Sequence, residues 1–150
     1  MEIKDKIGSI LNYKNNDLFT ASPDDTVFQA IEKMSDKNVG ALPVVDQNGR
    51  LIGIVSERDY TRKVILNGKS SQTTRVKQIM TSNLVTAKPR DSVEKAMHTM
   101  TEKKVRHLPI LDENKMVGIV TIGDLVKWTI SAQGAMIDQL EGYIRGSYPA

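Results

Sequence analysis

A glycine and two apolar residues, followed by a hydroxyl side chain and, three residues after it, an aspartate, occur twice in this chain. Ser56 precedes Asp59, and Thr121 precedes Asp124, each time after a short apolar segment that begins with a glycine. We expect each hydroxyl to lie where a strand ends and a helix begins. There it would point, with the free backbone N–H groups of the first helical turn, to one anion-binding spot. The carboxylate could accept hydrogen bonds from both hydroxyl groups of a ribose, so the pattern favours a nucleotide site.

The same spacing is also close to an ordinary capping box, in which the hydroxyl and the acid bond to free N–H groups of the helix itself. For a single occurrence we would favour the cap, but two occurrences in matched contexts favour the nucleotide site. A cap does not need a glycine in the preceding segments 53–55 and 118–120, whereas a base lying against a strand benefits from one.

The chain as a whole is a tandem repeat. Three segments return in the second half: 20–27 as 86–93, 39–46 as 105–112, and 53–59 as 118–124. A repeat this long indicates two subdomains rather than a solenoid, whose units are about 20–50 residues long and need at least three copies. Two copies predict a pseudo-twofold pair with a cleft between them.

Each copy is predicted to form a β-α-β-β-α unit. The elements expected in the first copy are a strand at 18–20, a helix at 27–34, a hairpin of strands 41–45 and 51–55, and a helix at 57–67. Asp25 is the expected cap of the first helix, and Gly68 should end the second. Asn48-Gly49 supplies the positive φ angles of a tight hairpin turn.

The second copy repeats this scheme. Asp91 and Glu94 form the expected capping box of its first helix. Pro43 and Pro109 interrupt a predicted strand in each copy, and because proline cannot donate to a ladder, they indicate an edge strand or a ligand-facing position.

We expect the first copy at residues 1–68, the second at 69–130 and a helical tail at 131–150. The segments 3–7 and 76–80 resemble each other, so each copy should be led by a short helical turn. The tail carries an apolar stripe, which either packs on its own domain or forms a dimer contact, two equally favoured alternatives. The stripe consists of Met136, Ile137, Leu140 and Ile144.

Charge and composition exclude several classes of protein. Lys and Arg number 21 against 18 Asp and Glu, and the charges are interleaved, so the net charge of +3 is weak evidence for nucleic acid. A basic contact through Lys103, Lys104 and Arg106 is the weaker hypothesis of this class. The absence of cysteine, of a signal-like start and of a long apolar run predicts a cytoplasmic chain with no membrane span.

The motifs that occur twice are Thr-Ala-x-Pro, Val-x-x-Leu-Pro and Gly-apolar-apolar-Ser/Thr-x-x-Asp. Together they resemble a tandem pair of cystathionine-β-synthase-type (CBS) domains, called a Bateman module, over residues 3–130. No catalytic domain stands beside this region, so the chain is similar to free-standing prokaryotic members of the family. The resemblance implies an α+β fold with two βαββα subdomains packed sheet to sheet. It also implies clefts for AMP, ADP, ATP, S-adenosylmethionine or NAD.

In the family, the ribose and phosphate residues of one copy face an adenine pocket of the other. By position, one site would combine Ser56, Arg58, Asp59, Thr86, Val105, Arg106 and His107. The other would combine Ile119, Thr121 and Asp124 with Thr20, Val39, Gly40 and Ala41. Arg58 stands where the second copy has Gly123, so the first of these sites should favour ligands with more phosphate charge.

Catalysis has little support in the sequence. His98 and His107 lack a carboxylate at ligand spacing, and the chain contains no phosphate-binding loop and no nucleophile elbow. We therefore expect a regulatory homodimer without metal or catalytic cofactor, which binds an adenine nucleotide and signals to an unknown protein by a change of packing. The alternative is a protein-interaction adaptor with degenerate, empty sites.

Overall fold

The computed structural model of the chain describes residues 5–14 and 17–131. Its elements, in chain order, are α1 (Ile7–Tyr13), α2 (Val27–Lys37), β1 (Ala41–Val45), β2 (Leu51–Ser56), α3 (Glu57–Tyr60), a π-helical segment (Thr61–Ile65), α4 (Val76–Ile79), α5 (Val93–Lys103), β3 (His107–Asp112), β4 (Lys115–Thr121) and a helix at 122–131. The predicted tail stripe lies outside the described residues. None of the helices described is both long enough and apolar enough to span a membrane.

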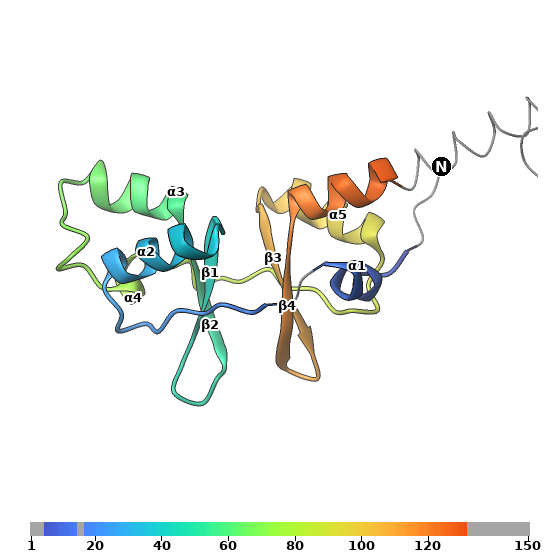
Figure 1. Cartoon of the computed structure of the whole chain (residues 1–150), viewed down its shortest axis with the longest axis horizontal. Helices are drawn as coiled ribbons and strands as arrows, with labels where there is room; N and C mark the ends of the chain where they lie inside the picture. The colour runs from blue at the N-terminus through green and yellow to red at the C-terminus, as the bar shows by residue number, and fades with distance from the viewer. Residues whose placement is uncertain (1–4, 15–16, 132–150) are drawn as a thin grey trace, which may run out of the picture.

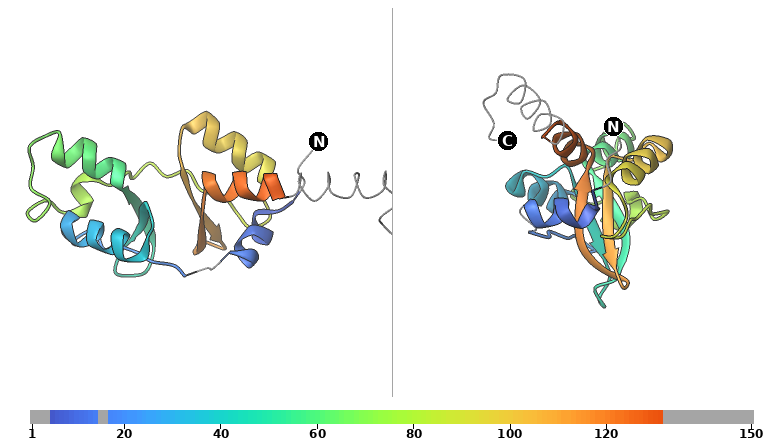
Figure 2. Two further views of the ribbon diagram at one scale, coloured as in Figure 1. Left: turned by 45° about the horizontal axis from the view of Figure 1, so that its top comes forward. Right: turned by 90° about the vertical axis from the view of Figure 1, so that its right-hand side faces the viewer.

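Each repeat is built around an antiparallel hairpin, β1 with β2 and β3 with β4. Figure 1 shows the two hairpins side by side in the middle of the molecule, with the helices on the outer sides, and the left view of Figure 2 shows the same arrangement. The predicted α+β fold with two related repeats is confirmed.

The strand predicted at 18–20 is reduced to one bridge, between Ala21 and Val44. The N–H of Ala21 donates to the carbonyl of Pro43 at 2.9 Å, and the N–H of Val45 donates to the carbonyl of Ala21 at 3.0 Å. The next bond of this parallel ladder would need an N–H on Pro43, which proline lacks. The proline therefore stops the strand after a single residue pair.

Pro109 has the same effect in the second repeat. The N–H of Ala87 donates to the carbonyl of Pro109 at 3.1 Å, and the parallel pairing is again one bridge long. On its other side Pro109 is paired with Ile119, as Pro43 is with Ile54. Each proline thus lies in a strand of a two-stranded sheet whose outer side carries a single bridge, as predicted for an edge position.

The N-cap of α2 lies one residue later than predicted. Thr26 is the cap: its hydroxyl accepts from the N–H of Gln29 at 3.1 Å, and the Gln29 side chain accepts from the N–H of Thr26 at 2.9 Å. Asp25 instead accepts from the N–H of Ser22 at 2.9 Å, closing the turn before the helix. The carboxylate is used in the turn, and the next hydroxyl takes the capping position.

The same shift occurs at α5. Ser92 caps the helix by accepting from the N–H of Lys95 at 3.0 Å, whereas Asp91 accepts from the N–H of Lys88 at 2.9 Å in the preceding turn. The predicted capping box of Asp91 and Glu94 is therefore wrong, for the same physical reason.

The predicted hairpin turn is confirmed in part. Gly49 has a positive φ of 78°, but Asn48 does not have a positive φ, and the Asp46 carboxylate accepts from the backbone N–H groups of Asn48 and Arg50. The helix predicted at 57–67 is formed by α3 and the π-helical segment, and Gly68 follows with a φ of 67°.

The two buried cores are completed by exchanged helices. Ile7, Ile10 and Leu11 of α1 are buried in the core of the second repeat, while Val76 and Ile79 of α4 are buried in that of the first. Figure 1 shows α1 next to the second hairpin, although it precedes the first repeat in the chain. The helix α1 therefore precedes the first repeat but packs on the second, and α4 precedes the second repeat but packs on the first.

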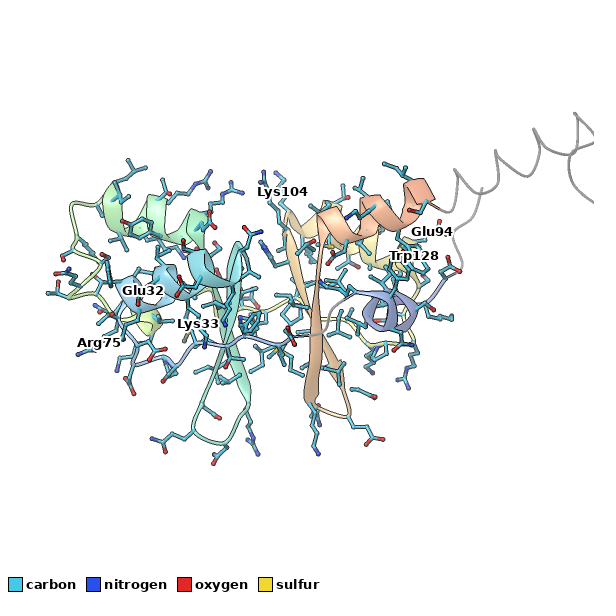
Figure 3. All side chains as sticks on the ribbon, in the orientation of Figure 1. Glu32, Lys33, Arg75, Glu94, Lys104 and Trp128 are labelled. Carbon is cyan, nitrogen blue, oxygen red and sulfur yellow. The ribbon has the colours of Figure 1, made fainter. Side chains whose placement is uncertain are left out.

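Polar contacts hold α1 in this position. The N–H of Ile7 donates to the carbonyl of Asp91 at 2.9 Å. Trp128, in the helix at 122–131, donates its indole N–H to the Asp5 carboxylate at 2.8 Å and stacks edge-on against Tyr13, with ring centroids 5.9 Å apart. Figure 3 shows Trp128 directly above α1. The start of α1 and the end of the second repeat thus form one packed unit.

Candidate functional site

Both hydroxyl–carboxylate pairs lie at a junction of strand and helix, and both form helix caps. The N–H of Asp59 donates to the Ser56 hydroxyl at 3.1 Å, and the Asp59 carboxylate accepts from the N–H of Ser56 at 2.9 Å. Thr121 and Asp124 make the same two bonds, at 3.0 and 2.9 Å. In each pair only Oδ2 of the carboxylate serves the cap, which leaves Oδ1 for another partner.

The two aspartates differ in the lysine that pairs with them. Oδ1 of Asp59 lies 3.1 Å from Nζ of Lys63, one turn further along the same helical segment. Oδ2 of Asp124 lies 2.7 Å from Nζ of Lys14, at the end of α1, and Nζ of Lys14 also donates to the carbonyl of Ile119 at 3.0 Å. Lys14 escaped the sequence analysis because 110 positions separate it from Asp124.

The Lys14 contact keeps Asp124 ionised. Partial burial raises the pKa of this carboxyl, but the hydrogen bonds from Lys14 and from the backbone N–H of Thr121, with the Lys14 charge, outweigh burial. The pKa of Asp124 is therefore below its ordinary value, and a carboxylate faces Lys14 at neutral pH.

A cavity of about 460 Å³ lies between the two repeats, and we call it the inter-repeat cavity. Its volume is within the range of small-molecule sites, about 300–1,000 Å³. It is lined by Lys14, Asp17, Leu18, Phe19, Lys37, Asn38, Val39, Gly40, Ala41, His107, Gly118, Ile119 and Thr121.

This cavity contains most of one predicted site. The predicted residues that line it are Val39, Gly40, Ala41, Ile119 and Thr121. Thr20 does not line it, although the adjacent Phe19 does, and Asp124 reaches it only through Lys14. Lys37 adds a second cation, whose Nζ lies 5.0 Å from the centroid of the Phe19 ring.

His107, which the prediction assigned to the site of Ser56, lines this cavity. Its Nε2 lies 3.6 Å from the point that a Cβ on Gly40 would occupy. Burial lowers the pKa of His107, as does the charge of Arg106, and these outweigh the opposing effects of Asp124 and Glu57. The imidazole is thus neutral at pH 7 and able both to donate and to accept.

The other predicted site is not gathered in the same way. Six of its predicted residues do not line the inter-repeat cavity: Ser56, Arg58, Asp59, Thr86, Val105 and Arg106. Arg58, Arg106 and Thr86 are exposed. Thr86 lines a separate space of only about 60 Å³. A second ligand site in this part of the protein, and the role of Arg58 in it, stay predictions.

The glycines before each pair have a packing role. A Cβ on Gly53 would lie 2.6 Å from Sδ of Met80, and one on Gly118 would lie 2.7 Å from Cδ2 of Leu11. Leu11 belongs to α1 and Met80 directly follows α4. Because glycine has no side chain, α1 can pack closely on the second hairpin and Met80 on the first. The sequence alone did not indicate this packing role.

Among the described residues, no cluster of three or more His, Asp or Glu side chains is arranged to hold a metal ion. The polar side chains around the inter-repeat cavity are the Thr121 hydroxyl that caps a helix, the carboxylates of Asp17 and Asp124, two ammonium groups, the Asn38 amide and a neutral imidazole. Such a set can form hydrogen bonds and ion pairs with a polar ligand.

Comparison with known proteins agrees with this architecture. A CBS-domain protein of Arabidopsis thaliana mitochondria, CBSX3, is 42% identical over 129 residues, which are 83% of this chain and 63% of that protein. This chain therefore spans less than two thirds of the length of that relative.

Solved structures agree with the fold. A candidate signal-transduction protein with CBS domains from Burkholderia ambifaria has a TM-score of 0.82 and 43% identity, over 85% of this chain and 96% of that one. The CBS-domain pair of protein MJ0100, solved with 5′-methylthioadenosine and S-adenosyl-L-methionine, has a TM-score of 0.75 and 25% identity, over 85% and 97% of the two chains.

The model of the CBS-domain family matches this chain twice, at residues 7–65 and 76–131. These two matches contain both hairpins and both hydroxyl–carboxylate pairs. The chain therefore belongs to the CBS-domain family and carries a tandem pair of CBS domains.

Proposed function

We propose that this chain is a regulatory module that binds an adenosine-containing ligand in the inter-repeat cavity. The observation that carries the proposal is the position of Thr121 and Ile119 across one cavity from Val39, Gly40 and Ala41. This is the combination that the family resemblance implies. The adenosyl ligands bound to the MJ0100 domain pair support the same class of ligand.

In this proposal each side of the cavity has its own task. The apolar backbone segment 39–41 faces the adenine, Asp124 accepts from the ribose, and the Thr121 hydroxyl lies at the start of the helix at 122–131. Because the cavity is lined by both repeats, a ligand that contacts both would favour one relative packing of the hairpins over others. The ligand signal would then pass to an unidentified protein through this packing.

The proposal is tested by titration followed by NMR. The chain is titrated with AMP, ADP, ATP, S-adenosylmethionine, NAD and, as a control, guanosine monophosphate. We expect at least one adenosine ligand to shift the backbone amides of Gly40 and Gly118, which line the cavity from opposite repeats. If no adenosine compound shifts them at millimolar concentration, the proposal fails, and the adaptor with empty sites becomes the better account.

We also propose that the module is a homodimer. Ile122, Val126 and Ile130 are spaced by four residues on the helix at 122–131, and they are 40%, 45% and 62% exposed. Residues at this spacing share one helix face, and a second chain would remove this apolar stripe from water. This face extends the dimer hypothesis to described residues, while the tail stripe stays a separate prediction.

Replacing Val126 by lysine should weaken this dimer. A charge in the middle of the stripe would have to be buried unpaired, so we expect the mass from light scattering to fall toward that of one chain. Lys127→Glu, a charge change at the neighbouring position, serves as the control and should leave the mass unchanged. A V126K variant that stays dimeric would show that the contact lies elsewhere.

No catalytic role is part of this proposal, and the adenine nucleotide is a ligand rather than a catalytic cofactor. The location of the protein in the cytoplasm stays a prediction from the sequence.

A further inference from the structure

Lys14 lines the inter-repeat cavity and also bonds to Asp124, the carboxylate of the second hydroxyl–carboxylate pair. In the part of the chain that the structure describes, no other residue outside the two pairs has both contacts. Its ammonium group is fixed by two acceptors, the Asp124 carboxylate at 2.7 Å and the carbonyl of Ile119 at 3.0 Å. The side chains of Lys14 and Asp124 are 27% and 25% exposed, so the pair is only partly screened by water.

The first repeat has no cation at the corresponding place. Leu11 and Met80 occupy equivalent positions, since each fills the space beside the equivalent glycine of a hairpin. Three residues after Leu11 is Lys14, which carries an ammonium group. Three residues after Met80 is Asn83, which carries a neutral amide. The cation beside Asp59 is Lys63, which comes from the same helical segment and does not line the cavity. The Lys14 contact is therefore particular to one of the two sites.

The charge balance of the cavity depends on this residue. Among the described residues, Lys14 and Lys37 are the two cationic side chains that line it, and His107 is neutral at pH 7. Without Lys14 the lining would lose one positive charge, and Asp124 would lose the partner that holds its charge. A less positive lining attracts a phosphate less strongly but has little effect on an uncharged nucleoside.

We propose that Lys14 gives the inter-repeat cavity a preference for adenosine ligands that carry a phosphate over uncharged adenosine. This inference rests on the proposed function and deepens it by naming the class of ligand. Lys14 is then a specificity-determining residue. It changes the ratio of the affinities for phosphorylated and uncharged adenosine ligands, but it does not decide whether a ligand binds at all.

The test compares AMP with adenosine in the wild-type chain and in Lys14→Met, with binding followed at the Gly118 amide in the cavity. Methionine keeps the length of the side chain and removes its charge. We expect the affinity for AMP to fall about tenfold, as for the loss of one partly solvated charge near a phosphate, while the affinity for adenosine changes less than twofold. Lys14→Arg keeps the charge and should preserve the wild-type ratio.

Lys63→Met is the matched control. It removes a lysine that pairs with the equivalent aspartate and also donates to a backbone carbonyl, that of Ile79 at 2.8 Å, but that does not line the cavity. The AMP-to-adenosine ratio at Gly118 should be unchanged in this variant. Circular dichroism and thermal unfolding establish that each variant is folded.

The outcomes separate the two proposals. If both ligands bind the cavity and K14M leaves their ratio unchanged, or weakens both equally, the role of Lys14 is overturned and the proposed function stands. If neither ligand shifts Gly118 in the wild-type chain, both proposals are overturned. A loss of AMP selectivity in K14M that K14R does not share supports the inference.

Discussion

Alanine in place of Asp124 is expected to weaken the binding of an adenosine ligand in the inter-repeat cavity by about tenfold to a hundredfold. Under the proposed function the carboxylate accepts charge-assisted hydrogen bonds from the ribose, which are worth about 1.5–3 kcal/mol. Oδ2 already accepts from Lys14 and from the N–H of Thr121, so Oδ1 is the oxygen we expect to face the ribose. Isothermal titration calorimetry measures the loss directly.

The capping bond of Asp124 is the main confounding factor, because its removal also destabilises the start of a helix by about 1 kcal/mol. Gln29→Ala is the matched control: it removes the equivalent side chain of the α2 capping box, which does not line the cavity. This variant should lose stability but bind the ligand as the wild type does. A 2′-deoxy ligand provides an independent check, since it should bind the wild type weakly and lose less than the parent ligand in D124A.

Wild-type affinity in D124A would mean that this carboxylate is only a helix cap and a partner of Lys14. The sequence analysis raised the cap as the alternative, and the structure shows that both aspartates do act as caps. The ribose contact that we propose for Asp124 would be a role in addition to the cap.

The sequence predicted the local elements well because each has a local cause. The apolar spacing of α2 and the Asn48-Gly49 turn involve residues close together in the chain. The errors were also local, but they arose from competition. Asp25 and Thr26 are both good caps, and a turn that uses the first leaves the second for the helix.

The features that the sequence did not predict depend on contacts between distant segments. Pro43 shortens a strand that precedes it by more than twenty positions, because its missing N–H would have served that strand. Lys14 enters the cavity only because α1 packs on the second repeat. No spacing within the motif at 118–124 could indicate that a lysine near the start of the chain would bond to its aspartate.

The exchange of helices has a large expected effect on stability. Ile7→Ala should lower the free energy of unfolding by about 2–5 kcal/mol, because Ile7 is fully buried and alanine would leave a cavity in a packed core. The loss should be localised in the second repeat, whose core Ile7 joins, although the residue precedes the first repeat in the chain. Chemical denaturation gives the total loss, and native-state hydrogen exchange shows where it falls.

Val76→Ala is the matched variant, since Val76 is equally buried at the start of α4 but belongs to the core of the first repeat. In I7A we expect faster exchange of the β3 and β4 amides, and in V76A of the β1 and β2 amides, which is the opposite of the order in the chain. Faster exchange of the β1 and β2 amides in I7A, with β3 and β4 unaffected, would contradict the exchanged arrangement. Equal acceleration of all four strands would show instead that the two repeats unfold as one cooperative unit, so that neither helix stabilises its repeat independently.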